Sequence, residues 1–296
     1  MLLMTEAIQA PPETRRRCAV CLAHDQRPTF RGLVQCARCG VIFYPHGLAP
    51  HEAEALYSED YFSGQEYLDY LSDRTVHRMN FRARARGLRR FLPRGSTLFE
   101  IGCAYGLFLE VAHRDWTVSG CDISHDACRY GRDVLGLDVQ QGDFLDLDLE
   151  PGAVDAFVLW DTIEHLDDPA ACLERAYELL PPGGILALTT GDIGSALARR
   201  QGPRWRQIHP PTHLWYFSQA TISQMLSRIG FEIERVRSPG LWRSLGQIVY
   251  SLASLGKPGP SALYRFCTRV GLARVPVWMQ TFDLMFVVAR KPGGAP

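Results

Sequence analysis

The fold is indicated first by one stretch of the chain, Leu98-Phe99-Glu100-Ile101-Gly102-Cys103-Ala104-Tyr105-Gly106. Its apolar, β-favouring start and its small residues are typical of a buried strand that runs into a tight turn before a helix. Small residues let the backbone approach a ligand, and the acid Glu100 suits a cationic or hydroxyl-bearing one. A carboxylate directly before the turn disfavours a dinucleotide, whose pyrophosphate would lie at the helix N-terminus.

Strand and helix patterns alternate around this turn. β-rich runs occur at residues 97–103, 117–123, 138–144, 154–161 and 184–190, and helical patterns separate most of them, at 106–114, 124–135 and 169–180. Such repetition predicts an α/β fold with a doubly wound, Rossmann-like, mostly parallel sheet, whose ligands bind at the carboxyl ends of the strands. Later runs at 231–237 and 282–290 would complete seven strands.

Acids also follow the second and third predicted strands. Asp122, with Ile123 beside it, ends the second strand, where a carboxylate can accept both hydroxyls of a ribose. Asp143, after the third strand, can take an adenine amino proton, and the ring of Phe144 can flank the base. A single strand-end acid can equally cap a helix, but three at successive strand ends of one sheet indicate a ligand site.

At these motifs the chain resembles the class I S-adenosylmethionine-dependent methyltransferases, over residues 95–240 and the last strand. The matching stretches are E-I-G-C-A-Y-G (100–106), C-D-I-S (121–124), G-D-F (142–144), W-D-T-I-E-H-L (160–166) and L-L-P-P-G-G (179–184). The resemblance implies S-adenosyl-L-methionine as cofactor and methyl transfer as activity.

The resemblance also assigns residues to parts of that cofactor. It implies that Glu100, Gly102 and Gly106 line the methionine end, that Asp122 holds the ribose, and that Asp143 and Phe144 hold the adenine. The implied contacts further include Ala104, Tyr105, Ile123, Trp160 and Asp161. Ala104 departs from the family, which often has glycine at that position.

Four of the nine cysteines have the spacing of a metal site. Cys18, Cys21, Cys36 and Cys39 form C-x2-C-x14-C-x2-C, which can direct four thiolates at one tetrahedral ion. We expect a structural Zn2+ in a zinc ribbon over residues 17–45, with strands at 29–35 and 41–44; free thiols, a redox pair and a rubredoxin-like iron site are the alternatives. This segment beside the cofactor motifs resembles a bacterial group that includes zinc-containing sugar C-methyltransferases.

Residues 46–94 are aromatic and then rich in arginine. Five aromatic residues, Tyr57, Tyr61, Phe62, Tyr67 and Tyr70, precede or begin an arginine-rich helix predicted at 65–91. One interpretation is a helical lid whose tyrosines cover a ligand, backed by a cationic helix for phosphate or RNA. The other is an amphipathic helix with a solvated charged face, or one that packs on the acidic middle of the chain.

Methyl transfer needs a nucleophile in line with the methyl group and, for some acceptors, a base. Residues 191–220 are dense in Trp, Arg, His and Tyr and contain three prolines, which we interpret as a substrate loop. His213 is the first candidate base, because H-L-x-x-F-S resembles a stretch that related methyltransferases place over the active site, and His209 is the second. Glu164 and His165 are further candidates; each histidine can instead have a structural role.

Two other features bear on substrate and partners. Arg204 and Arg206 suit an anionic group such as a phosphate, a nucleotide-linked sugar or a carboxylate. Residues 239–280 form an insertion with two helical patterns, the first of which, 241–255, has a broad apolar face. This face suits a membrane surface, a second copy of the chain, the sheet or a lid over the pocket. Because few basic residues flank it, we expect a lid or a homodimer contact and no membrane contact.

The 296 residues carry 32 basic and 32 acidic side chains, which argues against a nucleic-acid partner. The charge is segregated, since residues 95–190 have 4 basic and 18 acidic side chains. That acidic block suits a cationic sulfonium cofactor. No run of 18 apolar residues predicts a transmembrane segment, and the N-terminus has no secretory pattern, so we expect a cytoplasmic protein.

We therefore predict a disordered N-terminus (1–16), a zinc ribbon (17–45), a helical lid region (46–94) and a methyltransferase domain (95–291). The predicted function is in-line methyl transfer to a small molecule, such as a nucleotide-linked sugar or a natural-product intermediate, with a loop histidine as base. An RNA methyltransferase is the alternative, against which stand the neutral charge and only two lysines. A non-catalytic binding or scaffold protein is the second alternative, against which stand the intact cofactor acids.

Overall fold

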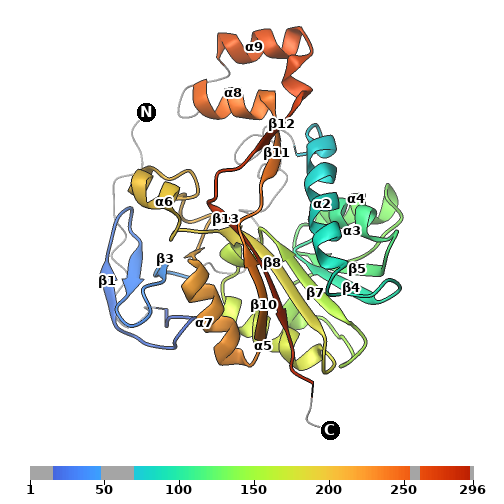
Figure 1. Ribbon diagram of the computed structural model, residues 1–296, viewed down its shortest axis with the longest axis vertical. Helices are drawn as coiled ribbons and strands as arrows, with labels where there is room; N and C mark the ends of the chain where they lie inside the picture. Colours follow the sequence, from blue (N-terminus) through green and yellow to red (C-terminus); the bar gives the residue numbers. More distant parts are fainter. Residues whose placement is uncertain (1–15, 48–69, 254–260, 294–296) are drawn as a thin grey trace. The chain divides into compact units, whose positions relative to one another are not determined.

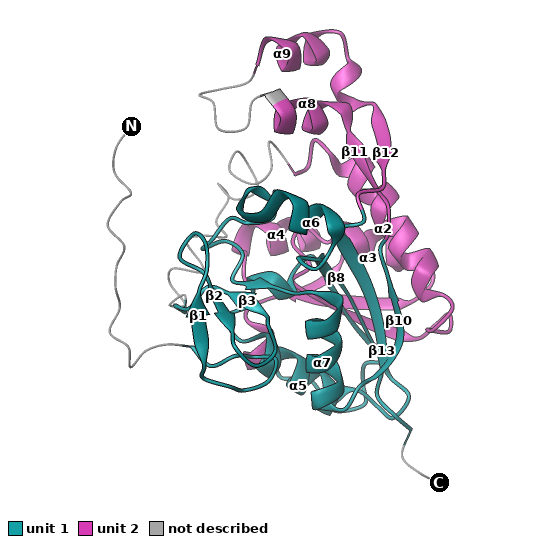
Figure 2. Ribbon diagram, turned by 60° about the vertical axis from the view of Figure 1, so that its left-hand side comes forward, with its two compact units in different colours: residues 1–53, 147–238, 282–296 teal, residues 54–146, 239–281 magenta. Residues whose placement is uncertain are grey.

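The computed structural model describes residues 16–47, 70–253 and 261–293 (Figure 1). Seven strands form one sheet in the order β10-β13-β8-β7-β4-β5-β6. The chain divides into two compact units (Figure 2): unit 1 has residues 1–53, 147–238 and 282–296, and unit 2 has residues 54–146 and 239–281. The predicted α/β fold with a seven-stranded sheet is confirmed.

Unit 2 contributes three parallel strands, β4 (Thr97–Ile101), β5 (Thr117–Asp122) and β6 (Asp138–Gln141). Helix α3 (Leu107–Ala112) connects the first two strands and α4 (His125–Asp133) connects the second to the third. The predicted strands exist, but they end earlier than expected. The third ends at Gln141 because Gly142 has a φ of 146°, and a 3-10 helix, η3 (Phe144–Asp146), follows.

Helix α2 (Arg74–Leu88) precedes this part of the sheet and buries Val76, Phe81, Ala85 and Leu88. The helix was predicted at 65–91; residues 70–73 form a turn instead, and 65–69, with Tyr57, Tyr61, Phe62 and Tyr67, lie outside the described residues. Two of its charges meet acids of the same unit, since Arg78 donates twice to Glu110 at 2.8 Å and Arg89 donates to Asp115 at 2.8 Å. These ion pairs fit the interpretation of a helix that packs on the acidic middle of the chain.

The insertion of unit 2 contains a two-stranded antiparallel ribbon, β11 (Leu241–Ser244) and β12 (Pro276–Met279), which no sequence pattern predicted. Between the strands lie α8 (Leu245–Ala253), α9 (Ala262–Arg269) and the 3-10 helix η6 (Leu272–Arg274). The helix predicted from residue 241 therefore begins only at Leu245. Its first four residues are a strand because they pair with β12, where Trp242 lies opposite Trp278.

Unit 1 contributes β7 (Ala156–Trp160) and β8 (Ile185–Gly191), which are parallel and buried along their whole length. Strand β13 (Leu284–Arg290) is antiparallel to β8 and to β10 (Glu232–Arg237). Helices α5 (Pro169–Leu179), α6 (Ala196–Gln201) and α7 (Gln219–Ile229), with the 3-10 helices η4 (Ile163–His165) and η5 (Gly202–Arg204), complete this unit's part of the fold. Complete burial explains why both parallel strands read as continuous apolar runs.

The cysteine segment of unit 1 forms a four-stranded antiparallel sheet of β1 (Gln26–Pro28), β2 (Val34–Cys36), β3 (Ile42–Phe43) and β9 (Trp215–Tyr216). The strand predicted at 29–35 is wrong over its first five residues. Arg31 and Gly32 have left-handed φ values of 53° and 74°, and the Thr29 N–H donates to the Leu33 carbonyl, which closes a turn. The fourth strand comes from the predicted substrate loop, so this loop is anchored on the cysteine segment.

Candidate functional site

In the turn after β4, every second residue has a left-handed backbone: the φ values of Gly102, Ala104 and Gly106 are 72°, 45° and 74°. A side chain at Gly106 would also place its Cβ 2.7 Å from Leu137 Cδ1. Glycine is therefore required at that position on both grounds. Ala104 adopts its left-handed conformation with a Cβ, which explains why glycine is common there in the family that the turn resembles.

Asp122 holds this turn in place. Its Oδ2 accepts the Ala104 N–H at 2.7 Å and its Oδ1 accepts the Ser124 N–H at 2.9 Å. Burial raises the pKa of Asp122, and these two hydrogen bonds oppose that rise. Each carboxylate oxygen keeps a lone pair for a ligand hydroxyl. Asp122 and Ala104 were both predicted as ligand contacts, but the hydrogen bond between them has no signal in the sequence.

Glu100 lies at the same end of the sheet and is 2% exposed. Within the described part of the chain, its Oε2 atom is buried and has no hydrogen-bond partner. Burial raises the pKa of Glu100 well above its usual value, Arg84 lowers it, and the charge of Asp122 raises it further. A buried carboxylate oxygen without a partner is costly, and a ligand ammonium group would satisfy it. The residues present therefore fit the amino-acid end of S-adenosylmethionine.

The two residues predicted to hold the adenine, Asp143 and Phe144, differ in their exposure to solvent. Asp143 is exposed, and its Oδ1 accepts the Leu145 N–H at 2.9 Å. Phe144 is 3% exposed and its ring lies 6.1 Å from that of Phe99, so the ring belongs to the core. Tyr105 stacks on Tyr70, and Ile123 is partly exposed beside Asp122. Contacts of Asp143, Phe144, Tyr105 and Ile123 with adenine or ribose stay predictions.

In unit 1, Trp160 is the last residue of β7 and Asp161 follows it directly. The Asp161 N–H donates to the Thr189 carbonyl at 3.0 Å, and the Thr189 hydroxyl donates to Asp161 Oδ1 at 2.9 Å. Asp161 itself has a left-handed φ of 54°. Trp160 stacks on Phe286 at 5.8 Å. Thr189, which the sequence analysis missed, orients this acid.

The candidate catalytic side chains come together in the same unit. The Leu214 N–H donates to the Glu164 carbonyl at 2.8 Å, which aligns the two chain segments. The His213 ring centre then lies 4.5 Å from that of His165 and 3.9 Å from that of His209. One carboxylate oxygen of Glu164 and one ring nitrogen each of His165 and His213 lie within 4.8 Å of one another. The four residues named separately from the sequence thus form one cluster.

Hydrogen bonds define the protonation of two of these histidines. His165 Nδ1 lies 2.9 Å from the Thr212 carbonyl and His213 Nδ1 lies 3.1 Å from the Gln207 carbonyl. A carbonyl only accepts, so both Nδ1 atoms carry hydrogen and both Nε2 atoms are acceptors in the neutral rings. Burial lowers the pKa of His165 to about 4 and that of His213 well below its usual value. Both rings are therefore neutral at pH 7.

A small cavity lies beside this cluster. Its volume is about 10 Å³, near the space that one water molecule needs. The lining residues are Glu164, Thr190, Gly191, Trp205, Gln207, His213, Trp215 and Tyr216. Arg206 donates to Asp283 at 3.3 Å, and Trp205 Nε1 donates to the same fully buried acid at 2.9 Å. Arg206 thus has a structural partner, whereas Arg204 is exposed.

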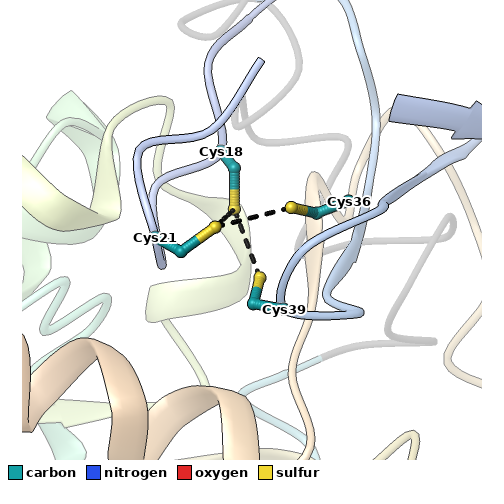
Figure 3. Close-up of side chains that lie close together, drawn as sticks. All are labelled: Cys18, Cys21, Cys36 and Cys39. Atoms are coloured by element: carbon teal, nitrogen blue, oxygen red, sulfur yellow. Dashed lines mark hydrogen bonds between the residues drawn. The ribbon is translucent and has the colours of Figure 1, made fainter. Parts of the chain in front are cut away.

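The four cysteine sulfurs of the N-terminal segment converge (Figure 3). The Sγ–Sγ distances are 3.5 Å for Cys18–Cys39 and Cys21–Cys36 and 3.7 Å for Cys18–Cys21, and all four sulfurs lie within 4.8 Å of one another. Thiolates about 2.3 Å from one zinc ion lie about 3.8 Å apart. Hydrogen bonding to the Cys39 thiol lowers the pKa of Cys18 to about 5, toward the thiolate form that binds metals. The cluster fits a tetrahedral metal ion.

The sequence of the chain is similar to those of known methyltransferases. The family of methyltransferase domains matches residues 72–236, which is more than half of the chain. A protein of Mycolicibacterium smegmatis named "Probable S-adenosylmethionine-dependent methyltransferase" is 30% identical over 149 residues, 47% of this chain and 53% of that one. A ubiquinone biosynthesis O-methyltransferase of Xanthomonas campestris is 30% identical over 103 residues, 32% of this chain and 43% of that one. The chain spans about half the length of the curated relatives it matches.

Structural comparison agrees on the fold. A SAM-dependent methyltransferase of Thermotoga maritima has a TM-score of 0.50 and 21% sequence identity, over 75% of this chain and 94% of that one. In the described ranges, no helix is both long and apolar enough to cross a membrane. With its sheet, its strand-end acids and the family match over residues 72–236, the chain belongs to the methyltransferase domain family of class I S-adenosylmethionine-dependent methyltransferases.

Proposed function

We propose that the protein transfers the methyl group of S-adenosylmethionine to a small molecule. The observation that carries this proposal is the buried Glu100 oxygen without a partner, at the end of β4 beside the turn that Asp122 holds. Bound there, the cofactor supplies a sulfonium methyl group that is already activated for in-line displacement. Glu100 would accept from its amino group, and Asp122 from its ribose hydroxyls.

For a substrate that loses a proton, we propose His213 Nε2 as the acceptor, with His165 as the second candidate. The Gln207 carbonyl keeps the His213 proton on Nδ1, so Nε2 is available at any pH at which the ring is neutral. The buried Glu164 carboxyl, 3% exposed, is close enough to stabilise a ring that has gained a proton. The lowered pKa makes His213 a weak base, so this role fits only a substrate whose own proton is acidic.

The proposed zinc ion has a structural role. The strand pair β3–β9 places Phe43 against Trp215, with ring centres 4.8 Å apart, and the Tyr44 N–H donates to the Leu214 carbonyl at 2.8 Å. Leu214 and Trp215 follow His213 directly. A metal that orders the cysteine segment would therefore also position the candidate base.

One observation favours the RNA alternative. A cavity of about 180 Å³ in unit 2 is lined by five arginines and one acid, together with Ala85 and Val111: Arg78, Arg82, Arg86, Arg89, Arg114 and Glu110. Glu110 neutralises Arg78 and Asp115 neutralises Arg89, so three of the guanidinium groups have no ion pair among the described residues and would be available to phosphates. A salt-sensitive gel shift with structured RNA, lost in Arg82→Glu/Arg86→Glu, would support this alternative.

Calorimetric titration with S-adenosylmethionine tests the leading proposal. Glu100→Gln keeps the side-chain shape but loses the charge, so we expect affinity to fall about tenfold or more while the melting temperature holds. Asp122→Ala should lose binding altogether. Asp133→Asn, at an exposed acid on α4, is the matched control and should bind as the wild type does. No heat of binding at high protein concentration, or full affinity in Glu100→Gln, would contradict the proposed site.

A further inference from the structure

The described residues of the unit 2 insertion, 239–253 and 261–281, expose an unusual amount of apolar surface; we call them the apolar arm. Seven of the nine exposed large apolar side chains in the described chain belong to the arm. They are Leu252, Leu263, Phe266, Val270, Leu272, Val275 and Trp278. Soluble monomers rarely expose contiguous apolar patches larger than a few hundred Å², and larger ones mark sites of interaction.

The arm has a small core of its own, so this exposure is not a sign of missing packing. Tyr250 of α8 meets Tyr264 of α9 with ring centres 5.7 Å apart, and Cys267 is 6% exposed. A Cβ at Gly246 would lie 3.0 Å from Ala273, which shows that α8 and the chain after α9 are in close contact. The arm is also fixed to α2, because Asn80 both donates to the Trp242 carbonyl and accepts its N–H.

The outer face of α9 carries a regular apolar stripe. Leu263 and Phe266 of α9, and Val270 directly after its last residue, are spaced by three and four residues, which places them on one side of the helix. Phe266 is 58% exposed and Leu263 55%. The inner residues Tyr264 and Cys267 alternate with the stripe, so α9 has two apolar sides and only one is covered within the described chain.

The charge of the arm restricts what can cover this face. Residues 239–281 contain no Asp or Glu, and they contain Arg243, Lys257, Arg265, Arg269 and Arg274. In a twofold dimer the same patch meets itself, so two cationic arms would repel each other and find no acidic partner there. An anionic lipid surface offers apolar depth and negative charge together.

We propose that the apolar arm binds the surface of an anionic phospholipid bilayer, with Leu263, Phe266 and Val270 entering the boundary between headgroups and acyl chains. Arg269 and Arg274 then contact lipid phosphates. The sequence predicts no membrane contact for residues 241–255, and these residues are not the ones that bind here. The residues that carry this inference follow them, in α9, at Val270 directly after it and in η6, and most of the basic residues of the arm also lie in α9 and η6.

Vesicle flotation of the full chain tests the proposal. The protein should float with vesicles of equal parts phosphatidylcholine and phosphatidylglycerol at low salt, and stay in solution with phosphatidylcholine alone. High salt should weaken binding because it screens the arginines. Phe266→Asp should lower the partition coefficient onto the vesicles about tenfold or more, because the phenyl ring no longer enters the apolar layer. Arg269→Glu/Arg274→Glu should remove the preference for phosphatidylglycerol.

Val134→Asp is the matched control, because Val134 is 62% exposed in the same unit but lies outside the arm. It should float as the wild type does. Thermal melting confirms that each variant folds, and all these positions are exposed. The proposal is overturned if the wild type ignores anionic vesicles or if Phe266→Asp binds them undiminished. It is equally overturned if the protein is a dimer in solution that Phe266→Asp dissociates, because a second copy then covers the face.

Discussion

Asp122 accepts the amide hydrogens of Ala104 and Ser124, so one carboxylate joins two backbone segments at the proposed cofactor site. The strained residue of that turn is Ala104, with its φ of 45°. A non-glycine residue in the left-handed region costs roughly 1–2 kcal/mol. The hydrogen bond to Asp122 helps to offset this cost.

Ala104→Gly tests this account of the turn. Removing the Cβ relieves the strain but increases the conformational entropy of the unfolded chain, so we expect a gain of about 0.5–1 kcal/mol in the free energy of unfolding. Urea unfolding of the cofactor-free protein measures it. Ala83→Gly, at an exposed position inside α2, is the control and should lose about 1 kcal/mol. An equal loss in both variants would show that the turn is unstrained.

The buried histidines predict a pH dependence of stability. In the unfolded chain a histidine binds a proton near pH 6.5, whereas in the folded chain His165 binds one only near pH 4, and His213 also binds one only well below its usual pKa. Between those values the unfolded state holds more protons. The free energy of unfolding therefore falls as the pH is lowered, by up to about 1.4 kcal/mol per unit for each histidine.

Urea unfolding at a series of pH values measures this slope. Stability should be fully present above about pH 6.5 and decline toward pH 4. His165→Gln/His213→Gln should flatten the decline, because both proton sites are gone. A variant whose stability still fell as steeply as that of the wild type would assign the acid sensitivity to other groups.

Sequence reasoning at the residue scale found the acids and missed their geometry. Glu100 and Asp122 could be predicted because the alternation of strand and helix patterns places both acids near the ends of strands. The left-handed φ of Ala104 could not, because a tertiary hydrogen bond holds it. Likewise, His165 and His213 were predicted as separate candidates. The hydrogen bond from the Leu214 N–H to the Glu164 carbonyl brings them together, and no local sequence pattern predicts it.

At the scale of elements, the cysteine segment holds the predicted substrate loop through the pairing of β3 with β9. The side chain of Arg228 attaches the same segment to helix α7, which follows the loop, since it donates to the carbonyls of Val20 and Ala19 at 3.0 and 3.1 Å. Both carbonyls lie between the first two cysteines of the motif. The order of the cysteine segment and that of the predicted loop are therefore coupled through the pairing of β3 with β9.

Removing the metal should release the loop. We expect one zinc per chain by elemental analysis, and its loss in Cys36→Ser or after chelation. Trypsin should then cleave within residues 199–206, which hold four arginines, while the metal-bound chain resists cleavage there. Cys267→Ser, which changes a cysteine outside the motif, should keep both zinc and protection. Cleavage that chelation leaves unchanged would refute the coupling.

The sequence predicts the long strands and helices correctly. It does not predict the short strands, which form only because they pair with distant parts of the chain. The buried strands β7 and β8 were predicted because continuous apolar runs are distinctive. Strand β9 has two residues and lay inside a predicted loop, and β11 was read as the start of a helix. Such short strands exist because of their partners, Ile42–Phe43 and Pro276–Met279, and their own residues do not reveal them.

At the scale of the whole molecule, charge and architecture are related less simply than the sequence suggests. The acidic block at residues 95–190 is divided between the two units at residue 147. Several of its acids have structural partners, as Glu110 and Asp115 have in Arg78 and Arg89. The net charge of the block therefore does not measure its attraction for a cationic cofactor. Glu100, whose Oε2 atom has no hydrogen-bond partner among the described residues, indicates that attraction more directly.

A crystal structure of the full chain grown with S-adenosylmethionine tests the central claim most directly. The account predicts the cofactor's amino nitrogen about 3 Å from Glu100 Oε2 and both ribose hydroxyls in hydrogen-bond reach of the Asp122 carboxylate. It also predicts that the Ala104 N–H stays on Asp122. A cofactor bound at another place, or one bound here that leaves Glu100 Oε2 without a partner, would contradict the account.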